Sequence, residues 1–200
     1  MNRRENQLMA APVTTDPQTE KTRAAWRGLR NQVNEHPFLK GFAPAQLAKL
    51  TDYAIEKDFQ EGQIILKEGE SADRFYLITD GQVALETEGP KGRAMTVQSL
   101  DAGTVLGWSW MFPPYQWQFT ARAAQPTTAL FFYATSLREL FDADSVLGCK
   151  LMQRIAEVVI VRLQNTRTAL LRACEMSACK QRGPCHSRSR GEAGQGDSAN

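Results

Sequence analysis

The residues best suited to bind a ligand lie in one segment, which runs from Gly107 to Ala123. Arg122 is the one cation in this segment. Four aromatic residues crowd around its central proline pair: Trp108, Trp110, Tyr115 and Trp117. Such rings either line a pocket for a flat or apolar ligand, or pack together as core and fill the space. The sequence leaves both interpretations open.

The sequence lacks the arrangement of histidines, carboxylates and cysteines that a catalytic metal site needs. A mononuclear centre in a cupin-like β-barrel uses two or three histidines and a carboxylate on facing strands. The only histidines are His36, which precedes the predicted strands, and His186, near the C-terminus. The spacing of Cys174, Cys179 and Cys185 fits no tight Cys-x-x-Cys zinc knuckle. We therefore expect no enzyme, no metal and no cofactor, and a cupin-like barrel enzyme is the remoter alternative.

Composition and charge narrow the function classes. A net charge of +2 over 200 residues is too small to predict nucleic-acid binding. No apolar run approaches the roughly 18 residues that span a bilayer, and Leu8–Ala11 is too short for the apolar core of a signal peptide. Cys149 lies in a helical pattern and the other cysteines lie in a polar tail, which does not suit a disulfide framework. These features predict a cytoplasmic protein without membrane attachment.

The strongest structural signal begins at Phe59. Short apolar runs rich in β-branched and aromatic residues alternate with acid–glycine pairs, which supply the positive φ angles of tight turns. About eight short strands in about 80 residues predict a mainly β, rolled sheet with flanking helices. The predicted strands are Ile55–Phe59, Ile64–Leu66, Phe75–Ile78, Val83–Leu85, Met95–Ser99, Val105–Gly107, Phe119–Ala124 and Ala129–Tyr133. The predicted flanking helices are Thr22–Asn34, one that starts at Pro44, and one that starts with capping-box spacing at Ser136 and Glu139.

The stretch that ends in Phe-Tyr-Leu-Ile-Thr-Asp-Gly-Gln-Val at residues 75–83 resembles a cyclic nucleotide-binding domain of the Crp/Fnr, or catabolite-activator, type. The resemblance covers roughly Phe38 to Leu171. It implies a double-stranded β-helix of the jelly-roll kind, followed by a long C-terminal helix. Relatives that bind DNA carry a winged helix-turn-helix after this helix, but no apolar pattern for one follows here. Direct DNA binding is therefore not expected.

The resemblance also assigns roles within the aromatic segment. In the family, a Gly-Glu pair precedes a short helix whose N-terminus receives the ligand phosphate; the Glu holds the ribose, and an Arg about ten residues later pairs with the phosphate. Gly107 matches the glycine, Trp108 stands at the Glu position, and the Arg position falls near Trp117 or Gln118. A cyclic nucleotide is therefore disfavoured as the ligand. The candidate ligand-binding residues are Gly107, Trp108, Ser109, Trp110, Trp117, Gln118 and Arg122. A serine at a helix start is more often simply a cap, and Arg122 matches a strand arginine of relatives just beyond the phosphate-binding stretch, which favours a structural role on the barrel.

A long helix is predicted at residues 145–173, where apolar residues recur every three or four positions. Between Ile155 and Leu163 they nearly encircle the helix, which indicates two partners: the roll and a second subunit. The dimer-helix candidates are Met152, Ile155, Val159, Leu163 and Leu170. We expect a disordered arm at residues 1–21, the roll with its flanking helices at 22–144, and a disordered tail at 174–200.

Taken as a whole, the sequence predicts a non-catalytic sensor or regulatory module with a degenerate phosphate-binding cassette. It would act as a homodimer in which ligand entry repositions the long helix and alters the dimer surface for a partner. The sequence does not identify the small ligand or the protein partner. The alternative is a divergent or truncated transcription regulator of the Crp/Fnr type.

Overall fold

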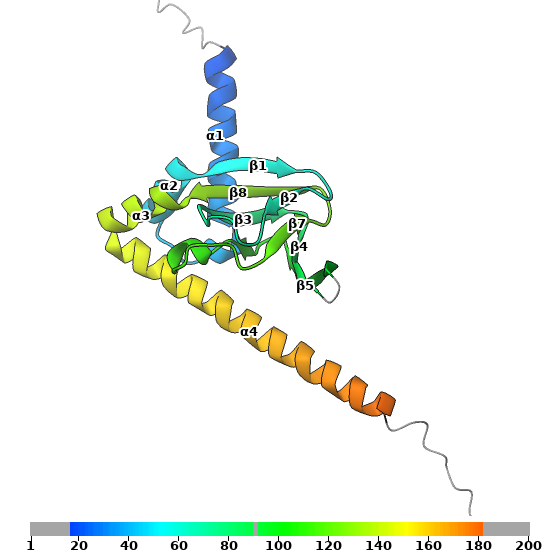
Figure 1. Ribbon diagram of the computed structural model, residues 1–200. Helices are drawn as coiled ribbons and strands as arrows, with labels where there is room; N and C mark the ends of the chain where they lie inside the picture. Colours follow the sequence, from blue (N-terminus) through cyan, green and yellow to red (C-terminus); the bar gives the residue numbers. More distant parts are fainter. Residues whose placement is uncertain (1–16, 90–91, 182–200) are drawn as a thin grey trace, which may run out of the picture. The chain divides into compact units, whose positions relative to one another are not determined.

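The computed structural model describes residues 17–89 and 92–181 and confirms the predicted β-roll (Figure 1). Its strands form two antiparallel four-stranded sheets, with the orders β1-β8-β3-β6 and β2-β7-β4-β5. The strands are β1 (Ile55–Phe59), β2 (Ile64–Leu66), β3 (Arg74–Asp80), β4 (Gln82–Glu88), β5 (Ala94–Asp101), β6 (Val105–Leu106), β7 (Thr120–Ala123) and β8 (Thr127–Tyr133). Each strand begins within two residues of its predicted position.

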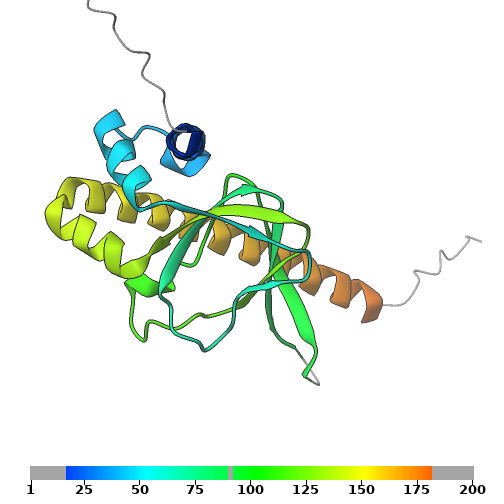
Figure 2. The same cartoon turned by 90° about the horizontal axis from the view of Figure 1, so that it is seen from above.

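Alternating side chains of both sheets fill the interior of the roll, around which the strands wrap in Figure 2. In β4, Val83 and Leu85 are buried, and in β7, Ala121 and Ala123 are buried. The residues between them in each strand therefore point to the outer face of the sheet. This alternation decides on which side of the sheet each candidate site residue of β7 lies.

Along the chain, helices precede and follow the strands of the roll. They are α1 (Pro17–Glu35), the 3₁₀ turn η1 (Pro37–Leu39), α2 (Pro44–Tyr53), α3 (Ala134–Ala143) and α4 (Ser145–Gln181). The predicted start at Pro44 is correct, because proline suits a first helical position. The predicted start at Ser136 is wrong: α3 follows β8 directly, and its N-cap, Tyr133, makes no side-chain capping bond.

Two expectations of disorder are corrected. Residues 17–21 are helical, since Pro17 can open a helix and Glu20 lies favourably in its first turn. Residues 174–181 continue α4 because they are mostly good helix formers and the breakers Gly183 and Pro184 come only later. The rest of the predicted arm and tail, including Cys185 and His186, lies outside the described residues. The chain divides into two compact units between Met152 and Gln153, within α4.

Candidate functional site

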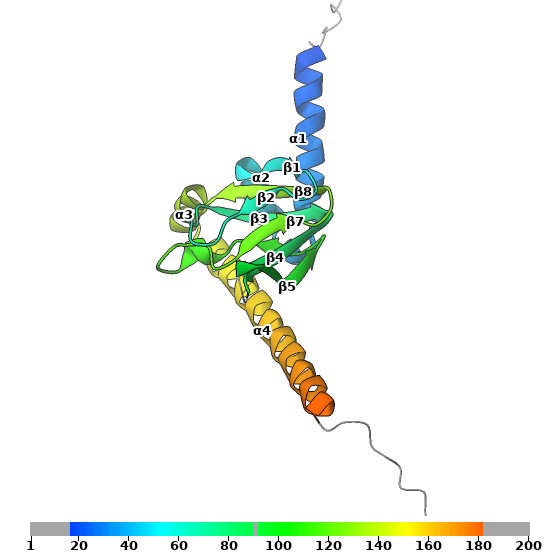
Figure 3. The ribbon, with the colours of Figure 1, turned by 45° about the vertical axis from the view of Figure 1, so that its right-hand side comes forward.

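The connection between β6 and β7 forms the predicted cassette. Gly107 has a φ of +83°, a left-handed conformation that glycine adopts without strain. The chain then enters the short 3₁₀ helix η3 (Ser109–Met111), with Trp108 as its N-cap and Ser109 as its first residue. Figures 1 and 3 show this segment beside α3. The local chain path is therefore a glycine turn followed by a short helix, as the resemblance implies.

Trp117 packs directly against Gly107. A Cβ atom built on Gly107 would lie 3.1 Å from both Cη2 and Cζ3 of the Trp117 indole, and 3.0 Å from the carbonyl oxygen of Arg74. The Trp117 side chain is only 5% exposed. Its backbone N–H donates to the carbonyl of Glu70 and its carbonyl accepts from the N–H of Gly69, both at 2.9 Å. The residue near the expected arginine position thus covers the cassette glycine with an uncharged ring.

The other aromatic residues of the segment are divided between interior and surface. Trp110 is 1% exposed, and its ring centroid lies 5.9 Å from that of Phe141 in α3. Tyr115 is 46% exposed, whereas Trp108 is half-buried. Gln118 is exposed, and its Nε2 donates to the carbonyl of Gln116. The segment is therefore core at two tryptophans and surface at Tyr115.

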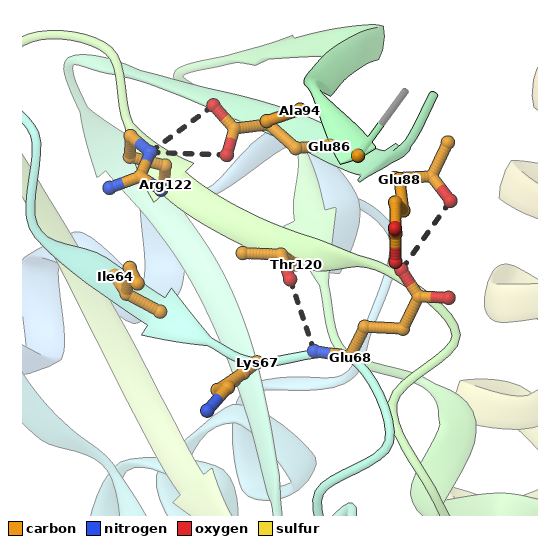
Figure 4. Close-up of a pocket in the computed structure, with 10 residues that line it drawn as sticks. Ile64, Lys67, Glu68, Glu86, Glu88, Ala94, Thr120 and Arg122 are labelled. Carbon is orange, nitrogen blue, oxygen red and sulfur yellow. Dashed lines mark hydrogen bonds and ion pairs between the residues drawn. The ribbon is translucent and has the colours of Figure 1, made fainter. Parts of the chain in front are cut away.

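Arg122 lies elsewhere, on the outer face of the sheet. It alternates with the buried residues of β7, and its Nε lies 3.1 and 3.2 Å from the two carboxylate oxygens of Glu86. Its Nη1 also donates to the carbonyl of Gly62 at 2.9 Å. Figure 4 shows this pair at the edge of an open pocket of about 620 Å³ over β2, β4, β5 and β7. Arg122 thus connects two strands and a turn.

Both basic and acidic side chains line this open pocket: Lys67, Arg122, Glu68, Glu86 and Glu88. The Glu68 carboxylate accepts from the Thr87 hydroxyl. The backbone N–H of Glu68 donates to the Thr120 hydroxyl, as Figure 4 shows. Across residues 17–89 and 92–181, no group of three or more His, Cys, Asp or Glu side chains could hold a metal ion. Over the same residues, no helix combines the length and the apolar character needed to cross a bilayer.

One contact at the cassette was not predicted from the sequence. Arg138, on α3, donates from Nη2 to the carbonyl oxygen of Trp110 at 2.6 Å. Its guanidinium carbon also lies 5.6 Å from the ring centroid of Trp110 and 5.5 Å from that of Tyr115. The signal that was available is the proline pair at residues 113 and 114, which cannot donate a backbone N–H to this carbonyl within the helix.

Comparisons with known proteins agree with this fold. A family model described as the cyclic nucleotide-binding domain matches residues 56–144. A crystal structure from Geobacter metallireducens GS-15, provisionally named a cyclic nucleotide-binding protein, is 30% identical with a TM-score of 0.58; the match covers 68% of this chain and 96% of that one.

Two curated proteins are also similar. The cGMP-dependent protein kinase egl-4 of Caenorhabditis briggsae is 33% identical over 87 residues, which are 44% of this chain and 11% of the kinase. The CRP-like cAMP-activated global transcriptional regulator of Mycobacterium tuberculosis is 26% identical over 136 residues, which are 66% of this chain and 57% of the regulator. This chain thus matches only part of each of these longer proteins. Together with the β-roll and the glycine turn of the cassette, these matches show that the chain belongs to the cyclic nucleotide-binding domain family.

Proposed function

We propose that this chain is a non-catalytic regulatory module whose cassette does not bind a cyclic nucleotide through the family's charged contacts. The observation that carries the proposal is the indole of Trp117 lying against Gly107. The resemblance places a phosphate-binding arginine close to this position and a ribose-binding glutamate at Trp108. Neither indole can form an ion pair with a phosphate, and Trp108 cannot accept a hydrogen bond from a ribose hydroxyl.

The energetic cost of these replacements is large. A hydrogen bond to a charged group contributes about 1.5–3 kcal/mol, so loss of two removes roughly 3–6 kcal/mol of binding. This corresponds to about two to four decades in the dissociation constant. The positive end of a helix adds only about 0.3–1 kcal/mol, which does not replace an arginine.

Two arginines that follow the cassette in the sequence have other partners. Arg122 is paired with Glu86 on the outer face of the sheet, and Arg138 donates to the Trp110 carbonyl. Arg122 would have to leave Glu86 and the outer face of the sheet to reach a phosphate in the cassette. This supports weak binding of cyclic nucleotides.

Calorimetric titration tests the proposal. Cyclic AMP and cyclic GMP should bind with dissociation constants well above micromolar. Adenosine and guanosine keep the base and ribose but lack the phosphate, so they test whether the aromatic residues form an open pocket or fill the space themselves. Quenching of tryptophan fluorescence by either nucleoside would favour the pocket. Micromolar or tighter binding of either cyclic nucleotide would overturn the proposal. Native mass spectrometry of protein from its own host would detect a co-purifying ligand directly.

We also propose that the module acts as a homodimer whose two subunits pack together through α4. Four of the five dimer-helix candidates are exposed in the single chain: Met152 (47%), Val159 (38%), Leu163 (66%) and Leu170 (64%). Ile155, which we also expected there, is 2% exposed and so does not belong to this exposed stripe. Exposed apolar residues along a long helix suit a coiled-coil partner.

A transcription regulator of the Crp/Fnr type is the second candidate, favoured by the similarity to the mycobacterial regulator. This function requires DNA binding with a steep salt dependence, because phosphate contacts release counterions. Titration of labelled duplex DNA at two salt concentrations tests it. Absence of binding at low salt would exclude direct action of this chain on DNA.

A further inference from the structure

The carbonyl of Trp110 has no backbone donor within its own helix. In η3, the carbonyl of Trp108 accepts from the N–H of Met111 at 3.1 Å, and that of Ser109 accepts from Phe112 at 3.3 Å. Continuing the helix would require the Trp110 carbonyl to accept from residue 113 or 114. Both are prolines and have no N–H. An acceptor on a residue that is 1% exposed is therefore left to be satisfied from outside the helix.

Arg138 supplies the missing donor. Its Nη2 lies 2.6 Å from the Trp110 carbonyl oxygen, a short distance typical of charge-assisted hydrogen bonds. The guanidinium also lies 5.6 Å from the Trp110 ring centroid and 5.5 Å from the Tyr115 ring centroid, both within cation–π range. A planar guanidinium can donate in its plane while its faces meet aromatic rings, which an ammonium group cannot do.

The two rings that meet Arg138 bracket the cassette loop. Trp110 lies in η3, and Tyr115 follows the proline pair. The N–H of Tyr115 donates to the carbonyl of Phe112, and its carbonyl accepts from the N–H of Ala72 at 2.8 Å. Arg138 therefore contacts both ends of the segment from residue 110 to residue 115, and does so from α3.

We propose that Arg138 is the positioning residue of the cassette, holding η3 and the following loop against α3 through Trp110 and Tyr115. It acts through these two residues and does not itself contact a ligand. The inference rests on the proposed function only in treating residues 107–118 as the ligand-facing segment. Whether the Arg138 side chain holds the loop from residue 110 to residue 115 in place can be measured without any ligand.

Hydrogen–deuterium exchange of the full chain tests the proposal. In Arg138→Gln, the amides of Met111, Phe112 and Tyr115 should exchange about ten- to a hundredfold faster, the loss expected when a hydrogen bond to a charged group is removed. Arg138→Lys keeps the charge but not the planar donor, so it should give an intermediate increase. The matched control is Arg27→Gln, which removes an exposed arginine of α1.

Two outcomes would overturn the proposal. One is exchange at the three cassette amides that changes no more than in Arg27→Gln. The other is an equal acceleration across β3 and β8, which would show that Arg138 supports the whole domain and not the cassette. If Arg138→Gln does not fold, Arg138→Lys is judged by the same two criteria. Because no nucleotide is used, failure here is separate from failure of the titrations that test the proposed function.

Discussion

His36 and Ile78 connect the segment before the roll to β3, which lies inside its sheet: Nε2 of His36 is 3.1 Å from the carbonyl oxygen of Ile78. The carbonyl can only accept, so Nε2 carries the hydrogen. Nδ1 of the same ring lies 3.3 Å from the backbone N–H of Phe38 and accepts from it. The ring is therefore neutral, and it is 4% exposed. Burial lowers the pKa of His36 below its ordinary 6.5, while the Ile78 carbonyl raises it by less.

The first prediction is a loss of stability in mild acid. Because the pKa of His36 is lower in the folded than in the unfolded state, its contribution is complete above 6.5 and is lost as the pH falls from there through the folded pKa. Denaturant titrations between about pH 8 and about pH 5 should show a steeper loss for the natural protein than for His36→Asn, which keeps an acceptor for Phe38 but does not titrate. His186→Asn, at the other histidine, is the control. Parallel curves for the natural protein and His36→Asn would contradict this assignment.

The second prediction concerns Gly107. Gly107→Ala should destabilise the protein by about 1–2 kcal/mol more than Gly62→Ala. The two glycines have similar φ angles, +83° and +80°, but nothing lies within 4 Å of a Cβ on Gly62, while a Cβ on Gly107 meets the Trp117 ring at 3.1 Å. The comparison separates crowding from backbone strain. Measured by denaturant unfolding, equal costs at the two sites would mean that the Trp117 ring and the Arg74 carbonyl, which lies 3.0 Å from the same Cβ, both move aside freely.

The third prediction restores the family's charges. Trp108→Glu with Trp117→Arg should tighten binding of cyclic AMP or cyclic GMP by at least about tenfold over the natural protein, because each restored charged hydrogen bond contributes about 1.5–3 kcal/mol. Each single variant should give a smaller gain. Calorimetry provides the measurement, and circular dichroism checks that the fold survives. No gain in the double variant would show that more than these two side chains blocks the cassette.

The β-roll could be predicted because its signals are local. Acid–glycine pairs such as Asp80-Gly81 specify turns, and alternation such as Val83 and Leu85 specifies an inward face. The helix ends were less predictable: α3 starts without a side-chain cap, so Ser136 gave a misleading start. Boundaries that depend on weak caps are decided by what the helix packs against.

The cassette was predictable in place but not in detail. The spacing from Gly107 located it, and the absence of a glutamate and an arginine could be read directly. The contact of Trp117 with Gly107 and that of Arg138 with Trp110 join residues from different elements. Such contacts depend on the tertiary arrangement, which spacing along the chain does not encode. Arg122 shows the same limit, since its partner Glu86 is identified only by the register of β4 and β7.

The last prediction concerns the proposed dimer. Along α4, a set of mostly apolar residues is spaced at alternating intervals of four and three positions, which is the spacing of a coiled-coil seam. The seam is Met152, Ala156, Val159, Leu163, Thr166 and Leu170. Val159→Asp with Leu163→Asp should convert a dimer to a monomer, because burying unpaired carboxylates in an apolar seam costs several kcal/mol, about a hundredfold or more in affinity.

Val161→Asp with Leu171→Asp is the matched control. These residues are 57% and 56% exposed, also lie on α4 and fall outside the seam spacing. Sedimentation velocity should show a dimer for the natural protein and for the control pair, and a monomer for the seam pair. A natural protein that stays monomeric at all accessible concentrations would exclude the dimer. Equal dissociation of both variant pairs would place the interface on a broader surface of α4 than the seam, since charge at any apolar position of the helix would then disrupt it.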